Sequence, residues 1–232
     1  MIHFAASIPT ADLARVTMDA RRVVAAGADA LHIDIRDDDD ESRNLRTGPA
    51  IVQAARRGSR ALDGSWMPLH VHLMVRSVQA LAGAFAEAGA DLISCHAEGL
   101  QGEVAPALRA IRAAGCRTGI VFDPVQPLTA LAAAIDIVDE VLVLGTLAGD
   151  GIQRLLPLAL VQIEQARRLI DASGRSVRLA VEGGVSVDNV RALADAGADT
   201  FVVGTALLGA SDCRLALGAL RRRLASPLAR AA

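Results

Sequence analysis

A helix–glycine–strand junction occurs three times in the sequence and constrains the fold more than any other feature. The segments AAGADALHID, EAGADLISCH and DAGADTFVVG begin at Ala25, Glu87 and Asp195, and each follows a stretch rich in alanine and leucine. Glycine suits the end of a helix, where the chain adopts a left-handed conformation that is costly for other residues. A run of apolar residues follows each glycine. Three copies of one junction predict a repeated unit of helix and strand.

Extending this pattern along the chain predicts eight short strands, most of them separated by helices. Eight alternating units in 232 residues favour the α/β class and a closed (β/α)8 TIM barrel, built as one domain over residues 1–232. The alternative is a doubly wound open sheet, which is weakened because no G-x-G-x-x-G segment follows the first strand. The expected strands are residues 2–7, 30–35, 69–75, 92–97, 117–122, 140–145, 177–182 and 200–204. The expected helices include residues 77–88, 103–114, 157–172, 188–196 and 212–225.

Composition and charge restrict the class of protein. Apolar residues make up 52% of the chain and aromatic residues only 2%, so the core must consist mainly of alanine, valine, leucine and isoleucine. The net charge is −2 and the basic residues are scattered, which argues against a nucleic-acid partner. No apolar run approaches the roughly 20 residues that cross a bilayer. Cys95, Cys116 and Cys213 form neither a metal-binding spacing nor an even set, so we expect a cytoplasmic protein.

Polar residues gather at the positions where the expected strands end. In a (β/α)8 barrel, the carboxyl ends of the strands carry the chemistry. A single histidine in a strand is most often a hydrogen-bonded core residue, but two carboxylates and two imidazoles at one end exceed what a structural barrel requires. The strand-end residues are Ser7, Asp34, His72, His96, Asp123, Gly145, Glu182 and Gly204.

Four polar residues form a candidate metal site. His32 and Asp34 are two positions apart on one strand, so both side chains face the same side of the sheet. His70 and His72 repeat this pattern on the next strand, and Glu182 ends the apolar run VRLAVE. If they all face the barrel mouth, His32, Asp34, His72 and Glu182 offer nitrogen and oxygen ligands for one divalent ion, such as Zn²⁺, Mn²⁺, Fe²⁺, Co²⁺ or Mg²⁺.

The acidic run after the second strand has a simpler interpretation. Asp37, Asp38, Asp39 and Asp40 would repel one another if they were buried, so we expect a solvated loop. One of these residues, such as Asp37, could face the site. This loop belongs to the longest gap between strands, residues 36–68, where a short helix is also expected.

Glycine-containing turns after the last two strands suggest a phosphate site. Barrels often hold phosphate at this corner through backbone N–H groups. Gly183, Gly184 and Gly204 would let the backbone approach such a group, and Thr205 would add a hydroxyl. The segment AGDGIQ, residues 148–153, offers another turn after the sixth strand. These glycines could serve only tight turns, but their place on the last two strands favours the phosphate interpretation.

Together, these segments resemble the ribulose-phosphate 3-epimerase family along nearly the whole chain. ASIPTADLARV resembles the family's opening serine-containing strand, LHIDIRD its H-x-D-x-M-D segment, and VHLMV its third-strand motif. ISCHAEG and GIVFDPVQPL resemble its fourth and fifth strands. VEGGVSVDNVRALADAGADTFVVGTALL resembles its D-G-G segment and its glycine-rich final strand. Ordered agreement at six places is specific, whereas no single motif would be.

The resemblance implies a barrel of the ribulose-phosphate-binding type and a role for each candidate residue. One divalent metal ion would be held by His32, Asp34, His72 and Glu182. Asp34 and Glu182 would also be the paired catalytic acid and base. The substrate-binding residues implied by the resemblance are Ser7, His72, Met74, Gly151, Gly183, Gly184, Gly204 and Thr205.

Several positions depart from the family's pattern near the expected substrate. Glu182 replaces an aspartate, which lengthens the acidic side chain by roughly 1.5 Å, and catalysis is sensitive to displacements of this size. Arg36 and Leu144 each replace a methionine, and His70 stands where an aspartate is usual. The loops after the second and sixth strands have also lost characteristic residues. These changes preserve the residues expected to bind the metal and the phosphate, but they do not specify which sugar is the substrate.

We therefore predict an isomerase of carbohydrate metabolism, a metal-dependent 3-epimerase of a ketose phosphate. The first choice of substrate pair is D-ribulose 5-phosphate and D-xylulose 5-phosphate, as in pentose phosphate metabolism. The alternatives are a 3-epimerase of another ketose phosphate such as allulose 6-phosphate, a barrel lyase or decarboxylase, and a non-catalytic sugar-phosphate binder. We expect no nucleic-acid or membrane partner, and the resemblance suggests a homo-oligomer.

Overall fold

The chain folds into a closed barrel of eight parallel strands, which confirms the fold predicted from the alternating pattern. The computed structural model describes residues 1–9, 12–36, 48–61, 63–100, 104–146 and 154–225. Neighbouring strands pair in sequence order, and the first strand also pairs with the last, which excludes the open doubly wound sheet. The strands are β1 (His3–Ser7), β2 (Ala30–Arg36), β3 (Leu69–Met74), β4 (Leu92–His96), β5 (Arg117–Phe122), β6 (Glu140–Leu144), β7 (Arg178–Glu182) and β8 (Thr200–Val203).

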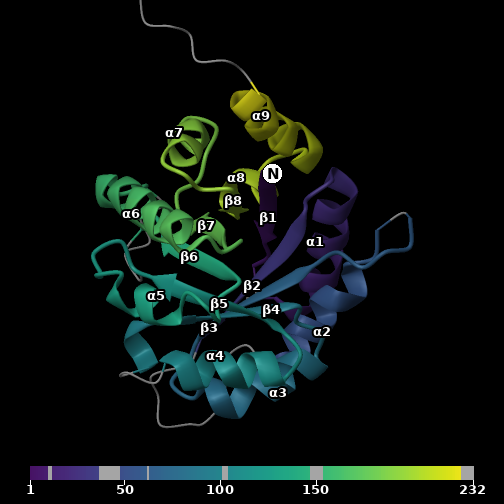
Figure 1. Ribbon diagram of the computed structural model, residues 1–232. Helices are drawn as coiled ribbons and strands as arrows, with labels where there is room; N and C mark the ends of the chain where they lie inside the picture. Colours follow the sequence, from purple (N-terminus) through teal and green to yellow (C-terminus); the bar gives the residue numbers. More distant parts are fainter. Residues whose placement is uncertain (10–11, 37–47, 62, 101–103, 147–153, 226–232) are drawn as a thin grey trace, which may run out of the picture.

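Helices cover the outside of the barrel (Figure 1). The five helices expected from the sequence are present, with ends within two residues of the expected ones, and α2 occupies the long gap between β2 and β3. The described helices are α1 (Leu13–Ala26), α2 (Pro49–Gly58), α3 (Val78–Glu87), the 3-10 turn η1 (Glu98–Leu100), α4 (Val104–Ala113), α5 (Thr129–Ala134), α6 (Pro157–Ser173), α7 (Val190–Asp195), α8 (Thr205–Leu208) and α9 (Cys213–Ala225).

The glycine and the aspartate of the repeated junction each have a structural role. The glycine lies in the left-handed region, with φ of 88° at Gly27, 108° at Gly89 and 116° at Gly197. The aspartate accepts a hydrogen bond from a backbone N–H near the start of the strand that precedes the helix, so each repeat closes one strand–helix unit. These bonds join Phe4 N to Asp29 Oδ2 at 2.8 Å, Leu69 N to Asp91 Oδ2 at 2.8 Å, and Leu179 N to Asp199 Oδ2 at 3.2 Å.

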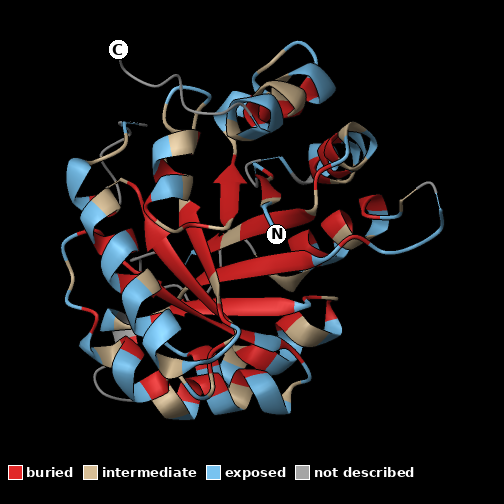
Figure 2. Ribbon diagram, turned by 45° about the horizontal axis from the view of Figure 1, so that its top comes forward, coloured by how far each residue is buried: buried red, intermediate tan, exposed pale blue. Residues whose placement is uncertain are grey.

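Two apolar clusters stabilise the barrel. The larger one lies between the strands and the surrounding helices, and Figure 2 shows the strands as almost continuously buried. The smaller cluster fills the inside of the barrel with short and medium side chains, because eight strands leave little room at the axis. Its members are Ala5, Ala30, Val121, Leu142, Leu144, Ala180 and Val202.

A buried polar pair lies at the start of the strands, on the inside of the barrel. His70 of β3 and Glu140 of β6 are 5% and 2% exposed, and their Nδ1 and Oε2 atoms are 4.0 Å apart. Neither atom has a hydrogen-bond partner among the described residues. Burial raises the pKa of Glu140 to about 7 and lowers the pKa of His70 well below its usual value. Burial thus favours the uncharged form of both groups.

Glu140 should make the free energy of unfolding fall as the pH rises from about 5 to about 8. The folded protein keeps the Glu140 proton up to a pH of about 7, whereas the unfolded chain releases it near 4.5, so folding binds a proton throughout this interval. Glu140→Gln mimics the protonated acid. The free energy of unfolding of this variant should therefore fall by about 3 kcal/mol less over this pH range than that of the unmodified protein. Urea unfolding at a series of pH values measures the difference.

The matched control for this prediction is Glu87→Gln, which changes an exposed glutamate at the end of α3. Its pH dependence should follow that of the unmodified protein. Parallel stability curves for Glu140→Gln and the unmodified protein would contradict the prediction.

None of the helices in the described part of the chain combines the length and the apolar character that crossing a membrane requires. The longest of these helices, α6, has 17 residues. Cys95, Cys116 and Cys213 are buried and free, so they form no disulfide with one another.

Candidate metal centre and active site

The ends of β2, β3 and β7 bring the four candidate ligands to one place. His32 and Asp34 lie two positions apart on β2, and Asp34 is level with His72 in the pairing of β2 with β3. Glu182 is the last residue of β7. One ligand atom from each of these side chains lies within 4.8 Å of the other three. Side chains that are distant in the sequence therefore form one cluster.

Each imidazole of the cluster approaches both carboxylates. His32 Nε2 lies 3.4 Å from Asp34 Oδ1 and 3.4 Å from Glu182 Oε2. His72 Nδ1 lies 3.2 Å from Asp34 Oδ1 and 3.3 Å from Glu182 Oε2. The imidazole side chains are only 2% exposed, whereas Asp34 is 29% and Glu182 16% exposed. The cluster is thus closed on the imidazole side and accessible on the carboxylate side.

The spacing within the cluster suits a divalent cation. For metal–ligand distances of roughly 2.0–2.1 Å, adjacent ligands of a tetrahedral site lie about 3.3–3.4 Å apart. The four imidazole–carboxylate separations here are 3.2 to 3.4 Å. Both ring nitrogens of His32 and Oε2 of Glu182 are buried without a hydrogen-bond partner among the described residues. Buried polar atoms without partners are rare, and a bound ion is one explanation for them.

The charges in the cluster stabilise one another. Burial opposes a charge on His32 and His72, but the neighbouring carboxylates outweigh burial and raise the pKa of both imidazoles. Burial likewise opposes a charge on Asp34 and Glu182, and the Asp34 charge also opposes one on Glu182. The two histidines outweigh these effects and lower the pKa of each carboxyl group. These pKa shifts favour the charged form of all four groups, and a divalent cation would take the place of the positive charge on the imidazoles. Its binding would release the protons that the imidazoles hold.

The longer side chain of Glu182 is accommodated in the cluster. Its Oε2 atom approaches both imidazoles, as given above, although the family pattern has a shorter acid there. Gly145, which follows β6, donates a backbone hydrogen bond of 2.5 Å to Glu182 O. A β-carbon on Gly145 would overlap the carbonyl oxygen of Gly183. Only glycine therefore permits the close approach of these two turns, which holds the backbone of Glu182 in place.

The glycines expected near a phosphate lie in turns beyond β7 and β8. Gly183 and Gly184 follow β7 with φ of 93° and 69°, values that glycine adopts without strain. Gly204 follows β8, and Thr205 begins α8. Gly151 falls outside the described residues.

Two further residues expected to contact substrate also lie at strand ends. Ser7 is the last residue of β1, and its Cβ lies 3.6 Å from the position that a β-carbon on Gly204 would take. Met74 is the last residue of β3 and pairs with Arg36 across the sheet. The tertiary structure thus brings the ends of β1 and β8 together, and likewise the ends of β2 and β3.

The sequence interpretation left two strand-end residues with ionisable side chains, His96 and Asp123, without a role. His96 ends β4, and its Nε2 lies 2.9 Å from Nε2 of His72. Asp123 follows β5, and its Oδ2 lies 3.9 Å from Nδ1 of His96. Burial, followed by the charge on His72, lowers the pKa of His96 to about 4. Both residues were visible as strand-end polar residues, but their contacts depend on the barrel's closure.

Arg36 is the last residue of β2 and lies on the same face of the strand as His32 and Asp34. Its side chain is exposed. Its positive charge contributes to the lowered pKa of His96, after burial and the charge on His72. The acidic run from Asp37 to Asp40 lies outside the described residues, and its expected solvated loop stays a prediction.

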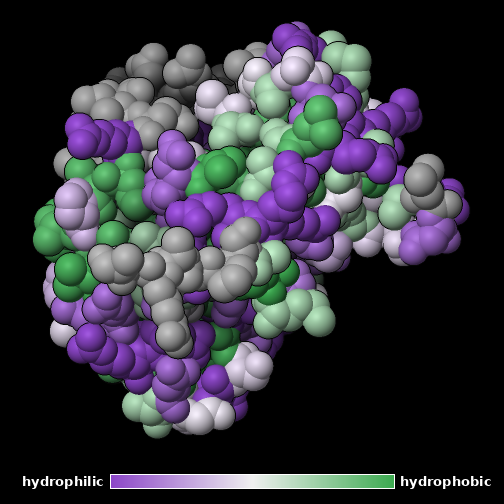
Figure 3. Space-filling view, turned by 90° about the horizontal axis from the view of Figure 1, so that it is seen from above, coloured by the Kyte–Doolittle hydropathy of each residue, from purple (hydrophilic) through white to green (hydrophobic). Residues whose placement is uncertain are grey.

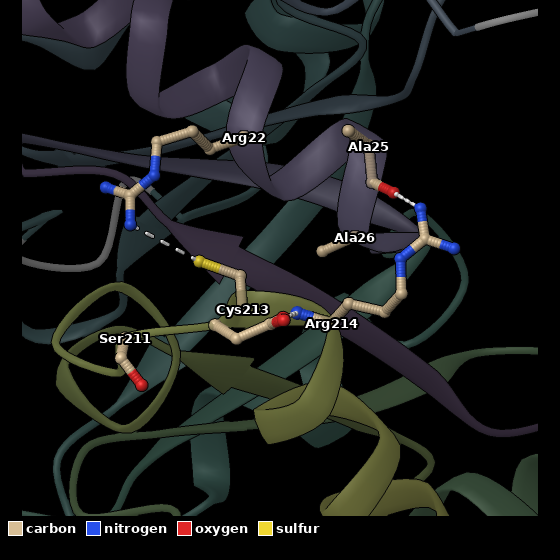
Figure 4. A pocket seen from close by; sticks show the side chains of 7 residues that line it. Arg22, Ala25, Ala26, Ser211, Cys213 and Arg214 are labelled. Carbon is tan, nitrogen blue, oxygen red and sulfur yellow. Dashed lines mark hydrogen bonds between the residues drawn. The ribbon is translucent and has the colours of Figure 1, made fainter.

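A surface hollow of about 320 Å³ lies between α1 and the start of α9, apart from the cluster (Figure 4). Two arginines line it. Arg22 Nη2 lies 3.8 Å from Cys213 Sγ, and Arg214 Nη2 donates a hydrogen bond of 2.6 Å to Ala25 O. Because the chain itself already engages both guanidinium groups, the hollow does not offer a ready anion site.

The fold and the cluster define a class of protein: a (β/α)8 barrel with a candidate divalent-metal centre at the carboxyl ends of its strands. Residues 3–208 match the Ribulose-phosphate 3 epimerase family. The ribulose-phosphate 3-epimerase of Serratia marcescens is 41% identical to this chain over 210 residues, which cover 90% of this chain and 97% of that protein. The chain belongs to the ribulose-phosphate 3-epimerase family.

Other comparisons support family membership and the fold. The ribulose-phosphate 3-epimerase of Escherichia coli (strain K12) is 38% identical over 221 residues, with 95% of each chain covered. Orotidine 5'-phosphate decarboxylase from Pyrococcus horikoshii OT3 superposes with a TM-score of 0.69 at 16% identity, covering 97% of this chain and 100% of that chain. At so low an identity, the structural similarity shows the barrel fold alone.

Proposed function

We propose that this protein is a metal-dependent 3-epimerase that interconverts D-ribulose 5-phosphate and D-xylulose 5-phosphate. The observation that carries the proposal is the convergence of Asp34 and Glu182. These carboxylates come from β2 and β7, on different sides of the barrel, and both approach the same two imidazoles. Epimerisation needs an acid and a base on opposite faces of the reacting carbon, and two such carboxylates supply them.

The reaction begins with removal of the proton on C3, which is weakly acidic because C3 is next to a ketone. One carboxylate takes this proton from one face, and the other carboxylate delivers a proton to the opposite face. In the reverse direction the two exchange roles. A divalent cation held by the cluster would stabilise the negative charge that develops on the substrate's oxygen atoms.

The phosphate end of the substrate would be held away from the reacting carbon. We assign it to the turns after β7 and β8, where Gly183, Gly184 and Gly204 leave the backbone accessible and Thr205 adds a hydroxyl. Ser7 and Met74 would line the sugar between the phosphate and the cluster. Anchoring the phosphate places C3 between the acid and the base, which contributes to the rate through orientation.

The direct test is exchange of the C3 proton for deuterium in D₂O with added Mn²⁺, Zn²⁺ or Co²⁺, followed by proton NMR. We expect exchange and epimerisation with D-ribulose 5-phosphate. Failure to exchange with every pentulose and hexulose phosphate would overturn the proposal. Loss of carbon from the product, measured by mass spectrometry, would indicate a lyase or decarboxylase instead.

A second candidate substrate is a longer ketose phosphate, such as allulose 6-phosphate, and Arg36 favours it. A guanidinium at the mouth adds hydrogen-bond donors for further oxygen atoms, which the family's methionine cannot provide. If Arg36 selects the longer sugar, Arg36→Met should lower kcat/KM for allulose 6-phosphate and leave the value for D-ribulose 5-phosphate within about threefold. Equal effects on both sugars would leave D-ribulose 5-phosphate as the preferred assignment.

We also propose that the protein is a homo-oligomer. Helix α6 exposes Leu158, Val161 and Leu169, which are 55%, 49% and 37% exposed. Figure 3 shows hydrophobic residues gathered toward the left, the side on which Figure 1 draws α6. Exposed apolar patches are common at protein interfaces. Light scattering after size-exclusion chromatography would measure the oligomeric state. The single-domain organisation and the cytoplasmic location stay predictions.

A further inference from the structure

His72 presents its two ring nitrogens to different partners. Its Nδ1 faces Asp34 and Glu182 at 3.2 and 3.3 Å, on the side where the cation would lie. Its Nε2 points the opposite way and lies 2.9 Å from Nε2 of His96. The rings of His72 and His96 are close to parallel, with their centroids 5.0 Å apart and an interplanar angle of 22°. The contact between the two histidines is therefore close and geometrically defined.

The protons on these two rings follow from this geometry. A neutral imidazole carries one proton, and a nitrogen that binds a metal carries none. If Nδ1 of His72 binds the cation, its proton must be on Nε2, which then donates the hydrogen bond to His96. Nε2 of His96 must accept this bond, so the single proton of His96 must be on Nδ1.

Asp123 lies on the side where that proton is expected. Its Oδ2 is 3.9 Å from Nδ1 of His96, which is too long for a direct hydrogen bond but places a carboxyl oxygen beside the N–H expected there. Oδ1 of the same carboxyl group is buried without a hydrogen-bond partner among the described residues. His96 and Asp123 are 18% and 19% exposed, so both are largely shielded from solvent.

We infer that His96 and Asp123 are positioning residues that fix the tautomer and ring orientation of His72, and so keep Nδ1 of His72 available for the metal ion. Metal-binding histidines commonly have such an outer partner, whose loss weakens metal binding by about 10- to 100-fold. The order of contacts is Glu182 and Asp34, then His72, then His96, then Asp123. The inference rests on the proposed metal site and does not depend on which sugar is the substrate.

Metal affinity of the intact chain tests the inference without any substrate. His96→Phe keeps a planar ring but removes the acceptor, and we expect it to weaken Zn²⁺ binding by about 10- to 100-fold in competition with a chromogenic chelator. His96→Gln offers a side-chain oxygen as acceptor, so its affinity should stay within about fivefold of the unmodified protein. Equal Zn²⁺ affinity of His96→Phe and the unmodified protein would overturn the inference.

A second measurement uses the unmodified protein and so does not depend on any variant folding. Two-dimensional nitrogen NMR of the zinc-loaded protein with ¹⁵N-labelled histidine identifies which nitrogen of each ring carries the proton. We expect His72 to be protonated on Nε2 and His96 on Nδ1, and Asp123→Asn to give His96 a mixture of tautomers. A proton on Nε2 of His96 would overturn the assignment. Because neither readout involves turnover, failure of the epimerase proposal would be recognised separately by the absence of C3 exchange.

Discussion

Replacing Glu182 by glutamine is expected to lower the rate of epimerisation by about 10²–10⁴-fold at saturating metal, the usual contribution of a general acid or base. Glutamine keeps the size of the side chain, and its amide oxygen can still approach a cation, but the group cannot take up a proton from carbon. The turns assigned to the phosphate lie beyond the carboxylate. Binding of a substrate analogue to the variant should therefore change little, and isothermal titration calorimetry would measure it.

The companion variant Asp34→Asn makes the test specific for a two-carboxylate mechanism. If each carboxylate serves one face of C3, then Glu182→Gln should still exchange the C3 proton of one epimer and Asp34→Asn that of the other. Proton NMR in D₂O, started separately from each epimer, distinguishes these outcomes. Exchange with the same epimer in both variants would contradict the assignment of the two carboxylates to opposite faces.

Glu182→Asp is the matched control for the glutamine variant. It retains a carboxylate and restores the residue of the family's pattern, so its loss of activity should be smaller than that of Glu182→Gln. Near wild-type epimerisation by Glu182→Gln would show that Glu182 is not the acid or base.

Replacing His32 by alanine should weaken Zn²⁺ or Co²⁺ binding by more than about 100-fold, because loss of a direct ligand exceeds the 10- to 100-fold effect of losing an outer partner. His32 is 1% exposed, and neither of its ring nitrogens has a hydrogen-bond partner among the described residues. Epimerase activity should fall in parallel and recover in part at high metal concentration. Competition with a chromogenic chelator, together with activity at increasing metal concentration, measures both effects.

His3→Gln is the control for this second prediction, because it also removes one of the five histidines. His3 begins β1 at the opposite end of the barrel from the cluster, so its replacement should leave metal affinity unchanged. If His32→Ala binds metal as tightly as His3→Gln, the proposed ligand set is wrong. Circular dichroism of both variants would separate a loss of metal binding from a loss of folding.

The sequence alone determined the fold class and the types of chemical group at the site. Apolar alternation and the repeated Gly-Ala-Asp junction are local signals, each contained within about ten residues. For this reason, the expected ends of all eight strands agree with the observed ends to within one residue. Asp34, His72 and Glu182 were likewise visible as residues near strand ends, and His32 as a residue on the same face as Asp34, because side chains two apart on a strand face the same side. The ordered motifs pointed to the family that the comparisons confirm.

Only the tertiary structure decided which of these groups touch. Strand register and barrel closure decide whether Glu182 reaches the imidazoles and which nitrogen of His72 faces His96. They also bring His70 and Glu140 together inside the barrel. These are relations between residues many positions apart, and a one-residue change in register would move each side chain by more than 3 Å and turn it to the other face. The alternation of side chains along a strand specifies which face of the sheet each residue occupies. It does not specify which residue of the neighbouring strand lies opposite.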